Sequence, residues 1–169
     1  ENEVIFVDPA SCKESHDEMK IINFLNKNNL LPIGIILTHC HFDHITGTKI
    51  LKEHFPNCKI AIHNLDKDAA SQNAKQMQEN ILNGMGFDFF ISALENLPKI
   101  DITFLGNETL NAFTSPELSS QAIEQLNNWK IIHTPGHTPG GICLFNKNQK
   151  QLIPGDTLIY QSYGRTDLP

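Results

Sequence analysis

The sequence predicts one layered α/β domain, and three observations support this fold class. Apolar runs of strand length alternate with helix-like segments over the first third of the chain. Three further strand-like runs follow one another closely near its end. Alternation of this kind is typical of sheets that are covered by helices. At 169 residues, of which 40% are hydrophobic, the chain is the size of a single domain, expected over 1–169, with a substantial core.

The first half of the chain is expected to alternate strand and helix. The apolar run from Glu3 to Val7 predicts a short buried strand, because Asp8-Pro9 stops it. Ser11 is placed to cap a helix over about residues 13–27. The elements expected next are a strand at 33–38, a helix at 46–55, a strand at 59–62 and a helical segment at 64–84, whereas 84–97 has no clear period.

The second half is expected to be richer in strands. A short strand is expected at 102–105. Ser115 followed by Pro116 resembles a helix start, and this helix would run to about Asn127. Three closely spaced strands, joined by short turns, are then expected at 129–132, 141–145 and 151–153.

Composition narrows the classes of partner. The formal net charge is -6 and lysine and arginine form no cluster, so nucleic acid is not expected as a partner. No apolar run approaches the roughly 18 residues of a membrane span, and the start does not resemble a signal peptide. The charge does not exclude a small anionic substrate. The cysteines form no C-x-x-C pair and are read as reduced thiols, which predicts a cytoplasmic protein. They are Cys12, Cys40, Cys58 and Cys143.

The segment THCHFDHITG, residues 38–47, concentrates potential metal ligands directly after an apolar strand. His39 and His41 are two positions apart, so in an extended chain their side chains point the same way and can meet one ion. Asp43 and His44 fall where the chain turns and are expected to face a neighbouring point. Imidazole and carboxylate ligands together suit zinc, iron or manganese. The alternative is a polar turn in which the histidines have no function. That interpretation would suit a single histidine, but it does not suit the H-x-H-x-D-H spacing after a buried strand.

Two later segments offer further ligands. In IIHTPGHTPGG, residues 131–141, proline and glycine predict a rigid turn with His137 at its tip as a ligand. His133 ends the preceding strand and is expected to be structural or to support a ligand. In IPGDTLIY, residues 153–160, Asp156 follows a strand and a glycine, so its carboxylate is expected at a strand end.

The remaining polar residues are given structural roles. His16 and His54 are expected on exposed helix surfaces, and His63 is expected to be structural, with a role in a substrate cleft as the alternative. Cys40 should point away from its neighbouring histidines. Arg165 is either a surface residue or part of an ion pair or anion contact.

In this order, FVDPA, THCHFDH, HTPGHTPGG, PGDTL and GRTDLP resemble the metallo-β-lactamase superfamily, specifically its glyoxalase II-like hydrolases. The resemblance covers nearly the whole chain. It implies a four-layer αββα sandwich with a metal site at one edge of the two sheets. It also implies that His39, His41 and His137 hold a first metal, that Asp43 and His44 hold a second, and that Asp156 bridges them. Asp43 is the ligand also expected to be catalytic.

The chain departs from the family pattern in two respects. The family's usual last histidine ligand and first strands are not found, so the chain is expected to be shortened at both ends, which leaves the second metal incomplete. Residues around 111–127 are expected to form an insertion, because relatives usually join the flanking segments by a short hairpin.

The resemblance implies a metal-dependent hydrolase that uses Zn²⁺, as one or two ions, with iron or manganese as alternatives. The reaction expected is hydrolysis of an S-acylglutathione-type thioester by a metal-bound hydroxide. Two alternatives stay open. One is a mononuclear iron persulfide dioxygenase built on His39, His137 and Asp156, and the other is a metal-binding domain without catalysis.

Overall fold

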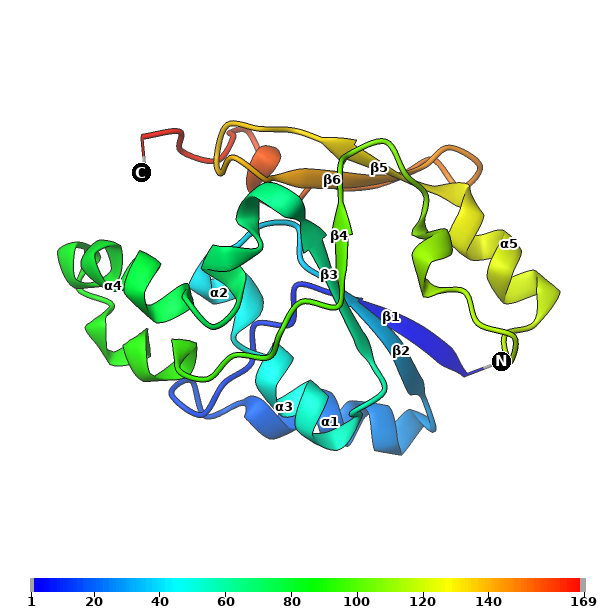
Figure 1. The fold of residues 1–169 in the computed structure, drawn as a ribbon, viewed down its shortest axis with the longest axis horizontal. Helices are drawn as coiled ribbons and strands as arrows, with labels where there is room; N and C mark the ends of the chain where they lie inside the picture. Colours follow the sequence, from blue (N-terminus) through cyan, green and yellow to red (C-terminus); the bar gives the residue numbers. More distant parts are fainter. Residues whose placement is uncertain (1, 168–169) are drawn as a thin grey trace.

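Two β-sheets pack against each other in the computed structural model, which describes residues 2–167 (Figure 1). Leu168 and Pro169 of the GRTDLP segment therefore lie outside the described residues. The first sheet is parallel, with the strand order β1-β2-β3-β4, and the second is antiparallel, with the order β5-β6-β7. The strands are β1 (Glu3–Val7), β2 (Leu31–Ile36), β3 (Lys59–His63), β4 (Ile102–Phe104), β5 (Trp129–His133), β6 (Ile142–Asn146) and β7 (Gln151–Ile153).

Helices cover the outer face of the parallel sheet. In Figure 1, α1 (Glu18–Asn28) and α3 (Thr48–His54) lie on the side of this sheet that faces away from β5 and β6. The other α-helices are α2 (Phe42–Ile45), α4 (Ala74–Met85) and α5 (Ser120–Asn128). Short 3₁₀ helices connect these elements at η1 (Asn64–Asp66), η2 (Asp68–Ala70), η3 (Asp88–Leu94), η4 (Leu110–Phe113) and η5 (Gly155–Thr157).

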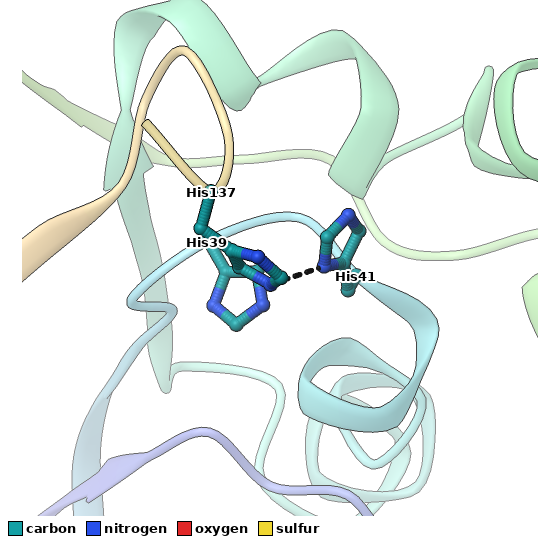
Figure 2. Close-up of side chains that lie close together, drawn as sticks. All are labelled: His39, His41 and His137. Carbon is teal, nitrogen blue, oxygen red and sulfur yellow. Dashed lines mark hydrogen bonds between the residues drawn. The ribbon is translucent and has the colours of Figure 1, made fainter. Parts of the chain in front are cut away.

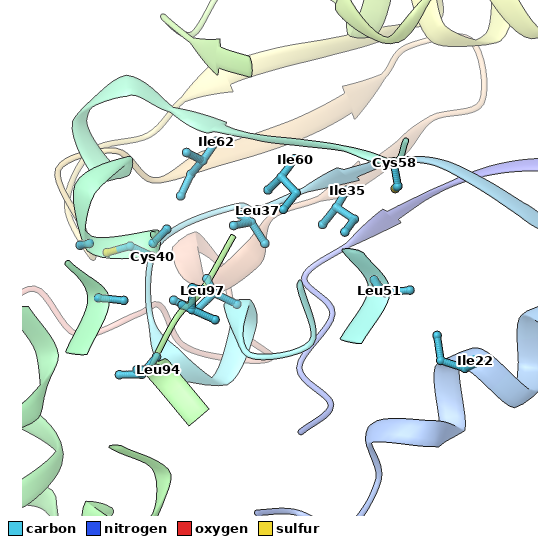
Figure 3. Packing of buried hydrophobic residues seen from close by; sticks show 14 of the residues in the cluster. Ile22, Ile35, Leu37, Cys40, Leu51, Cys58, Ile60, Ile62, Leu94 and Leu97 are labelled. Atoms are coloured by element: carbon cyan, nitrogen blue, oxygen red, sulfur yellow. The ribbon is translucent and has the colours of Figure 1, made fainter. Parts of the chain in front are cut away.

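Two hydrophobic clusters hold the layers together. Ile35 and Leu37 belong to the cluster between the parallel sheet and its helices, whereas Ile36 belongs to the cluster between the two sheets (Figure 3). On β3, Ile60 belongs to the cluster between the parallel sheet and its helices, and Ala61 belongs to the cluster between the two sheets. Alternate side chains point to opposite faces of a strand, so a strand buried on both faces is apolar throughout. This arrangement confirms the predicted α/β sandwich.

The first helix begins later than predicted. α1 starts at Glu18 rather than near residue 13, so the capping role predicted for Ser11 is wrong. The backbone nitrogen of Cys12 donates to the Asp17 carboxylate over 3.1 Å, which closes a turn before the helix. His16 lies in this turn with a φ of 55°, outside the helical region, and is exposed.

The helix expected at 46–55 is also different. It is shorter than expected and forms α3, which begins at Thr48, while the separate helix α2 precedes it. Gly47 lies directly before α3, and its N–H donates to the Pro9 carbonyl over 2.7 Å. A Cβ at Gly47 would lie 2.5 Å from that oxygen, so the close approach requires glycine. The strand expected at 33–38 ends at Ile36, because Thr38 turns toward the Asp8 side chain.

The helix predicted to start at Ser115-Pro116 starts at Ser120 instead. Its cap is Ser119, whose hydroxyl accepts from the backbone nitrogen of Ala122 over 3.0 Å. The Ser115 carbonyl accepts from Leu118 and closes a separate turn. This turn lets Leu118 join the cluster between the sheets, and that burial outweighs the local helix signal. Residues 111–127, predicted as an insertion, thus include most of η4, the turn that follows it and most of α5.

The parallel sheet directs several polar loops to one edge. Asp8 follows β1, the histidine-rich loop follows β2, and η1 follows β3. The carboxyl ends of neighbouring parallel strands meet at the same edge, which is where ligands bind in open α/β sheets. Within residues 2–167, no helix combines the length and the apolar character that a membrane crossing requires. The cytoplasmic location expected from the cysteines stays a prediction.

Candidate metal centre

Three imidazoles from two distant loops meet at this edge of the sheets. His39 and His41 come from the loop after β2, and His137 comes from the turn between β5 and β6 (Figure 2). Their ligand atoms all lie within 4.8 Å of one another. His41 Nδ1 and His137 Nε2 are 2.8 Å apart. The structure thus brings together the three residues predicted for a first metal.

A second group of ligand atoms adjoins the first. His39, His44 and Asp156 also offer ligand atoms within 4.8 Å of one another. One Asp156 oxygen lies 3.4 Å from His44 Nε2 and the other lies 3.5 Å from His137 Nε2. The Asp156 carboxylate thus adjoins both groups, and its bridging role stays a prediction.

Asp43 lies farther from the imidazoles. Its side chain is 56% exposed, and its nearer oxygen is 3.8 Å from His44 Nε2. Asp43 is a member of neither group of converging ligand atoms. Its predicted roles as ligand and catalytic carboxylate stay predictions.

Asp8 sets the orientation of His39 through Thr38. The Thr38 hydroxyl donates to Asp8 Oδ2 over 2.6 Å, and the Thr38 backbone nitrogen donates to Asp8 Oδ1 over 2.7 Å. With its hydrogen committed, the Thr38 oxygen accepts from Nδ1–H of His39 over 3.0 Å. His39 Nε2 is then left with its lone pair. It is buried and has no hydrogen-bond partner within the described part of the chain.

Hydrogen bonds at Nδ1 also orient the rings of His137 and His44. His137 Nδ1 lies 2.7 Å from the Arg165 carbonyl oxygen, which can only accept, so Nδ1 carries the proton. His44 Nδ1 lies 3.0 Å from the Asp8 carboxylate and donates to it. In both residues the lone pair is thereby directed to Nε2, which faces the cluster. Partners of this kind orient metal-binding histidines and increase the basicity of the free nitrogen.

Burial keeps two of these imidazoles neutral. Desolvation, reinforced by the neighbouring His44, His41 and His137, lowers the pKa of His39 to about 2. Desolvation and His137 lower the pKa of His41 to about 4. For His44, burial acts to lower the pKa, but the hydrogen bond and charge of Asp8 outweigh it and raise the pKa above its ordinary value. At neutral pH, His39 and His41 are therefore able to offer lone pairs to a cation.

The lowered pKa of His39 predicts that the metal-free protein loses stability in mild acid. Its pKa falls from 6.5 to about 2 on folding, so between these values the unfolded chain binds a proton that the folded chain excludes. The free energy of unfolding should then fall by up to about 1.4 kcal/mol per pH unit below pH 6.5 for this histidine. Denaturant unfolding between pH 7 and pH 5 measures the slope. His39→Gln should make it shallower, and an unchanged slope would contradict this account.

Asp66 joins the two histidine loops. Its carboxylate accepts from the backbone nitrogen of Cys40 over 3.1 Å, from the Thr138 hydroxyl over 2.6 Å and from the Gly140 nitrogen over 2.6 Å. Asp66 is 1% exposed, so these bonds replace its hydration. A Cβ at Gly140 would lie 2.6 Å from the Asp66 carboxylate, which explains the glycine at this position. Asp66 thus positions His39, His41 and His137 relative to one another.

Sequence reasoning missed Asp8, Thr38 and Asp66 as contributors to the site. Asp8 could have been predicted from the sequence. It ends a strand that is next to the strand before His39, and the carboxyl ends of neighbouring parallel strands lie at the same edge of the sheet. Asp66 could not have been predicted, because HNLDKD does not distinguish it from the exposed Asp68.

The other residues considered from the sequence lie outside the cluster. His63 and His133 stack with ring centroids 4.0 Å apart, and the His63 ring accepts from the Leu65 nitrogen, so both have structural contacts. Cys40 belongs to the hydrophobic cluster between the parallel sheet and its helices (Figure 3), and it is a member of neither group of converging ligand atoms. His54 is exposed at the end of α3. Arg165 forms a two-point ion pair with Asp167, at 2.7 and 2.8 Å.

The donor set fits a divalent metal ion. The buried, unpartnered His39 Nε2 and the close approach of His41 to His137 both have a ready explanation in a shared cation. Nitrogen donors with one carboxylate are typical of zinc and of iron or manganese sites. His39, His41 and His137 would hold a first ion, and His44 with Asp156 would contribute to a neighbouring one.

Curated relatives fall into more than one activity class. A probable metallo-hydrolase of Methanocaldococcus jannaschii is 31% identical over 86% of this chain and 59% of its own length. A hydroxyacylglutathione hydrolase of Haemophilus influenzae is 28% identical over the whole chain and 68% of its own length. The mitochondrial persulfide dioxygenase ETHE1 of mouse is 26% identical over 98% of this chain and 47% of its own length. The chain thus spans about half to two thirds of the length of these relatives.

Solved structures share the fold. The crystal structure of the B3 metallo-beta-lactamase BLEG-1 aligns with a TM-score of 0.74 and 24% identity, over 99% of this chain and 68% of its own. A protein crystallised in a di-iron-bound form, TTHA1623, aligns with a TM-score of 0.61 and 24% identity, over 98% of this chain and 66% of its own. The sequence profile of the metallo-beta-lactamase superfamily matches residues 1–169. The chain therefore belongs to the metallo-beta-lactamase superfamily.

Proposed function

We propose that this protein is a metal-dependent thioester hydrolase of the hydroxyacylglutathione hydrolase kind. The observation that carries the proposal is the convergence of the His39, His41 and His137 imidazoles beside a cavity, with the Asp156 carboxylate next to them. The similarity to the hydroxyacylglutathione hydrolase of Haemophilus influenzae supports the choice of a thioester. Zn²⁺ is the ion proposed, as one or two ions.

The residues of this chain prepare the site for hydrolysis. A bound divalent ion would lower the pKa of a coordinated water toward neutrality and polarise a carbonyl group. Asp8 holds the proton on Nδ1 of His44 and, through Thr38, on Nδ1 of His39, so that both Nε2 lone pairs face the cluster. Ring nitrogens that are fixed in this way need little reorganisation to bind the ion.

Thioesters suit a site with these groups. A thiol has an ordinary pKa of about 8.5, so it can leave as the thiolate without a strong acid. An alkoxide or amide leaving group would need a proton donor beside the cluster. The buried His39 and His41 are poor donors, because their pKa values of about 2 and about 4 keep them neutral.

Metal analysis paired with a thioester assay tests the proposal. Natively expressed, full-length protein should contain zinc, and the metal-loaded form should hydrolyse S-lactoylglutathione or another S-acylglutathione. A chelator should abolish the activity, and zinc should restore it. If the metal-loaded protein cleaves no thioester in such a panel, the proposal is wrong.

An iron persulfide dioxygenase is the second candidate. The similarity to the mouse persulfide dioxygenase favours it. Oxygen uptake by iron-loaded protein with glutathione persulfide distinguishes the two reactions. Uptake without thioester cleavage would replace the first proposal. Metal binding with neither activity would point to a binding domain.

A further inference from the structure

The cavity beside the histidine cluster has two chemically different ends. Its volume is about 340 Å³. The polar end contains His41, His137 and Asp156 of the candidate metal centre. The other end is apolar and is formed by side chains of α4 together with two phenylalanines. These apolar residues are Phe42, Ile81, Leu82, Met85 and Phe87.

The apolar end is well supported. Leu82 is 1% exposed and belongs to the cluster between the parallel sheet and its helices. The rings of Phe42 and Phe87 lie 5.8 Å apart, and Phe42 also contacts Phe90 with a ring separation of 5.1 Å. Phe42 directly follows His41 in the chain. The apolar wall is therefore fixed relative to the ligand loop and is a built feature of the site.

Polar groups near the apolar end are already engaged. The Gln78 amide nitrogen donates to the carbonyl oxygens of Cys40 and Ala69, each over 2.8 Å, so it has no donor left for a ligand. Arg165 lies beside the polar end, because its carbonyl accepts from His137 Nδ1, and its guanidinium is paired with the Asp167 carboxylate at two points. Asp43, the other charged residue of the lining outside the two groups of converging ligand atoms, offers only acceptor oxygens. A polar or charged group placed at this end would lose hydration without gaining equivalent partners.

We propose that the apolar end binds the acyl group of the substrate, and that the preferred substrates are thioesters with an apolar acyl chain, aliphatic or aromatic. This inference rests on the proposed thioester hydrolysis. A carbonyl at the polar end places its acyl chain along the α4 wall. The glutathionyl part, with two carboxylates and an ammonium group, would lie toward solvent, because the apolar end offers it no partners. Short hydroxyacyl groups would leave the wall unfilled.

A series with a constant thiol isolates the acyl contribution. Acetyl-, D-lactoyl-, butanoyl-, hexanoyl- and phenylacetyl-glutathione differ only in the group that the apolar end would hold. Each methylene that enters the cavity should raise kcat/KM roughly four-fold, the fold-change that corresponds to about 0.8 kcal/mol. Hexanoyl- and phenylacetyl-glutathione should therefore exceed D-lactoylglutathione by at least about ten-fold.

Variants on one helix provide a matched comparison. Met85 lines the cavity and is 44% exposed, whereas Met77 is on the same helix, is 53% exposed and does not line it. Met85→Ala should lower the ratio of kcat/KM for hexanoyl- over acetyl-glutathione about five-fold, and Met77→Ala should leave the ratio unchanged. Ile81→Ala, on a half-buried residue of the same apolar wall, should lower the ratio as well, so the test does not depend on Met85→Ala folding normally.

A binding measurement separates this inference from the proposed reaction. S-hexylglutathione and S-methylglutathione are thioethers that cannot be hydrolysed, and calorimetry on the full-length protein compares their affinities. S-hexylglutathione should bind at least about ten-fold more tightly. Equal binding, or a lactoyl thioester cleaved as fast as the hexanoyl thioester, would overturn the acyl preference but leave thioester hydrolysis standing. Tight S-hexylglutathione binding without cleavage of any thioester would overturn the proposed reaction instead.

Discussion

His39→Ala is expected to lose bound metal and activity together. His39 is the residue that belongs to both groups of converging ligand atoms, so its removal depletes both. Loss of a partner that merely orients a ligand costs roughly 10–100-fold in metal affinity or activity, and loss of the ligand itself should cost more. Metal content by elemental analysis and thioesterase activity on the same sample measure the effect.

The matched control is another histidine of the same chain. His16 is exposed in the turn before α1, away from the loops that bear the ligands, so His16→Ala should change neither metal content nor activity. Circular dichroism of both variants separates a loss of ligand from a loss of fold. If His39→Ala retained both metal and activity, the assignment of the ligands would be wrong.

Asp66→Asn is expected to destabilise the protein and to weaken metal binding at a distance. The carboxylate accepts three hydrogen bonds from the two histidine loops, and the amide group of asparagine would place donors against donors there. A hydrogen bond to a charged group contributes about 1.5–3 kcal/mol, so a loss of at least about 3 kcal/mol in the free energy of unfolding is expected. Denaturant unfolding of the metal-free protein measures it.

Asp68→Asn is the control for this prediction. Asp68 is exposed and lies two positions away, so its substitution should change stability by no more than about 0.5 kcal/mol. Asp66→Asn should also lower metal affinity, because the loop that carries His137 would no longer be fixed to the loop that carries His39 and His41. A variant with normal stability and normal metal affinity would show that Asp66 does not join the loops.

The local sequence pattern predicted the bounds of two strands correctly, because residues close in the sequence determine them. β3 was predicted nearly to the residue because it is buried from Ile60 onward, and the half-buried edge strand β1 was predicted to the residue because Asp8-Pro9 stops it. β2 ended early because Thr38 forms hydrogen bonds with Asp8, a contact across 30 residues that no local pattern contains. α5 started late because Leu118 is buried between the sheets, which is likewise decided by tertiary packing.

In the candidate site, the proposed ligands were predicted from local sequence pattern, whereas the residues that orient them were not. The spacing of His39 and His41, the rigid turn around His137 and the strand end before Asp156 predicted residues that the fold places together. The residues that orient them were not predicted, because Asp8 and Asp66 act through partners that only the folded chain brings near. The need for glycine at position 155 was not predicted for the same reason. Its φ is 52°, and a Cβ added there would lie 2.4 Å from the hydroxyl oxygen of Thr38, a residue distant in the sequence.

Anomalous diffraction from crystals of metal-loaded, full-length protein tests the central claim most directly. The claim is that His39, His41 and His137, from loops almost a hundred residues apart, hold one cation through ring nitrogens. We expect the anomalous peak measured at the zinc edge to lie among these three imidazoles, with Asp156 beside it. A peak elsewhere on the protein, or metal-loaded crystals with no peak among these rings, would contradict the account.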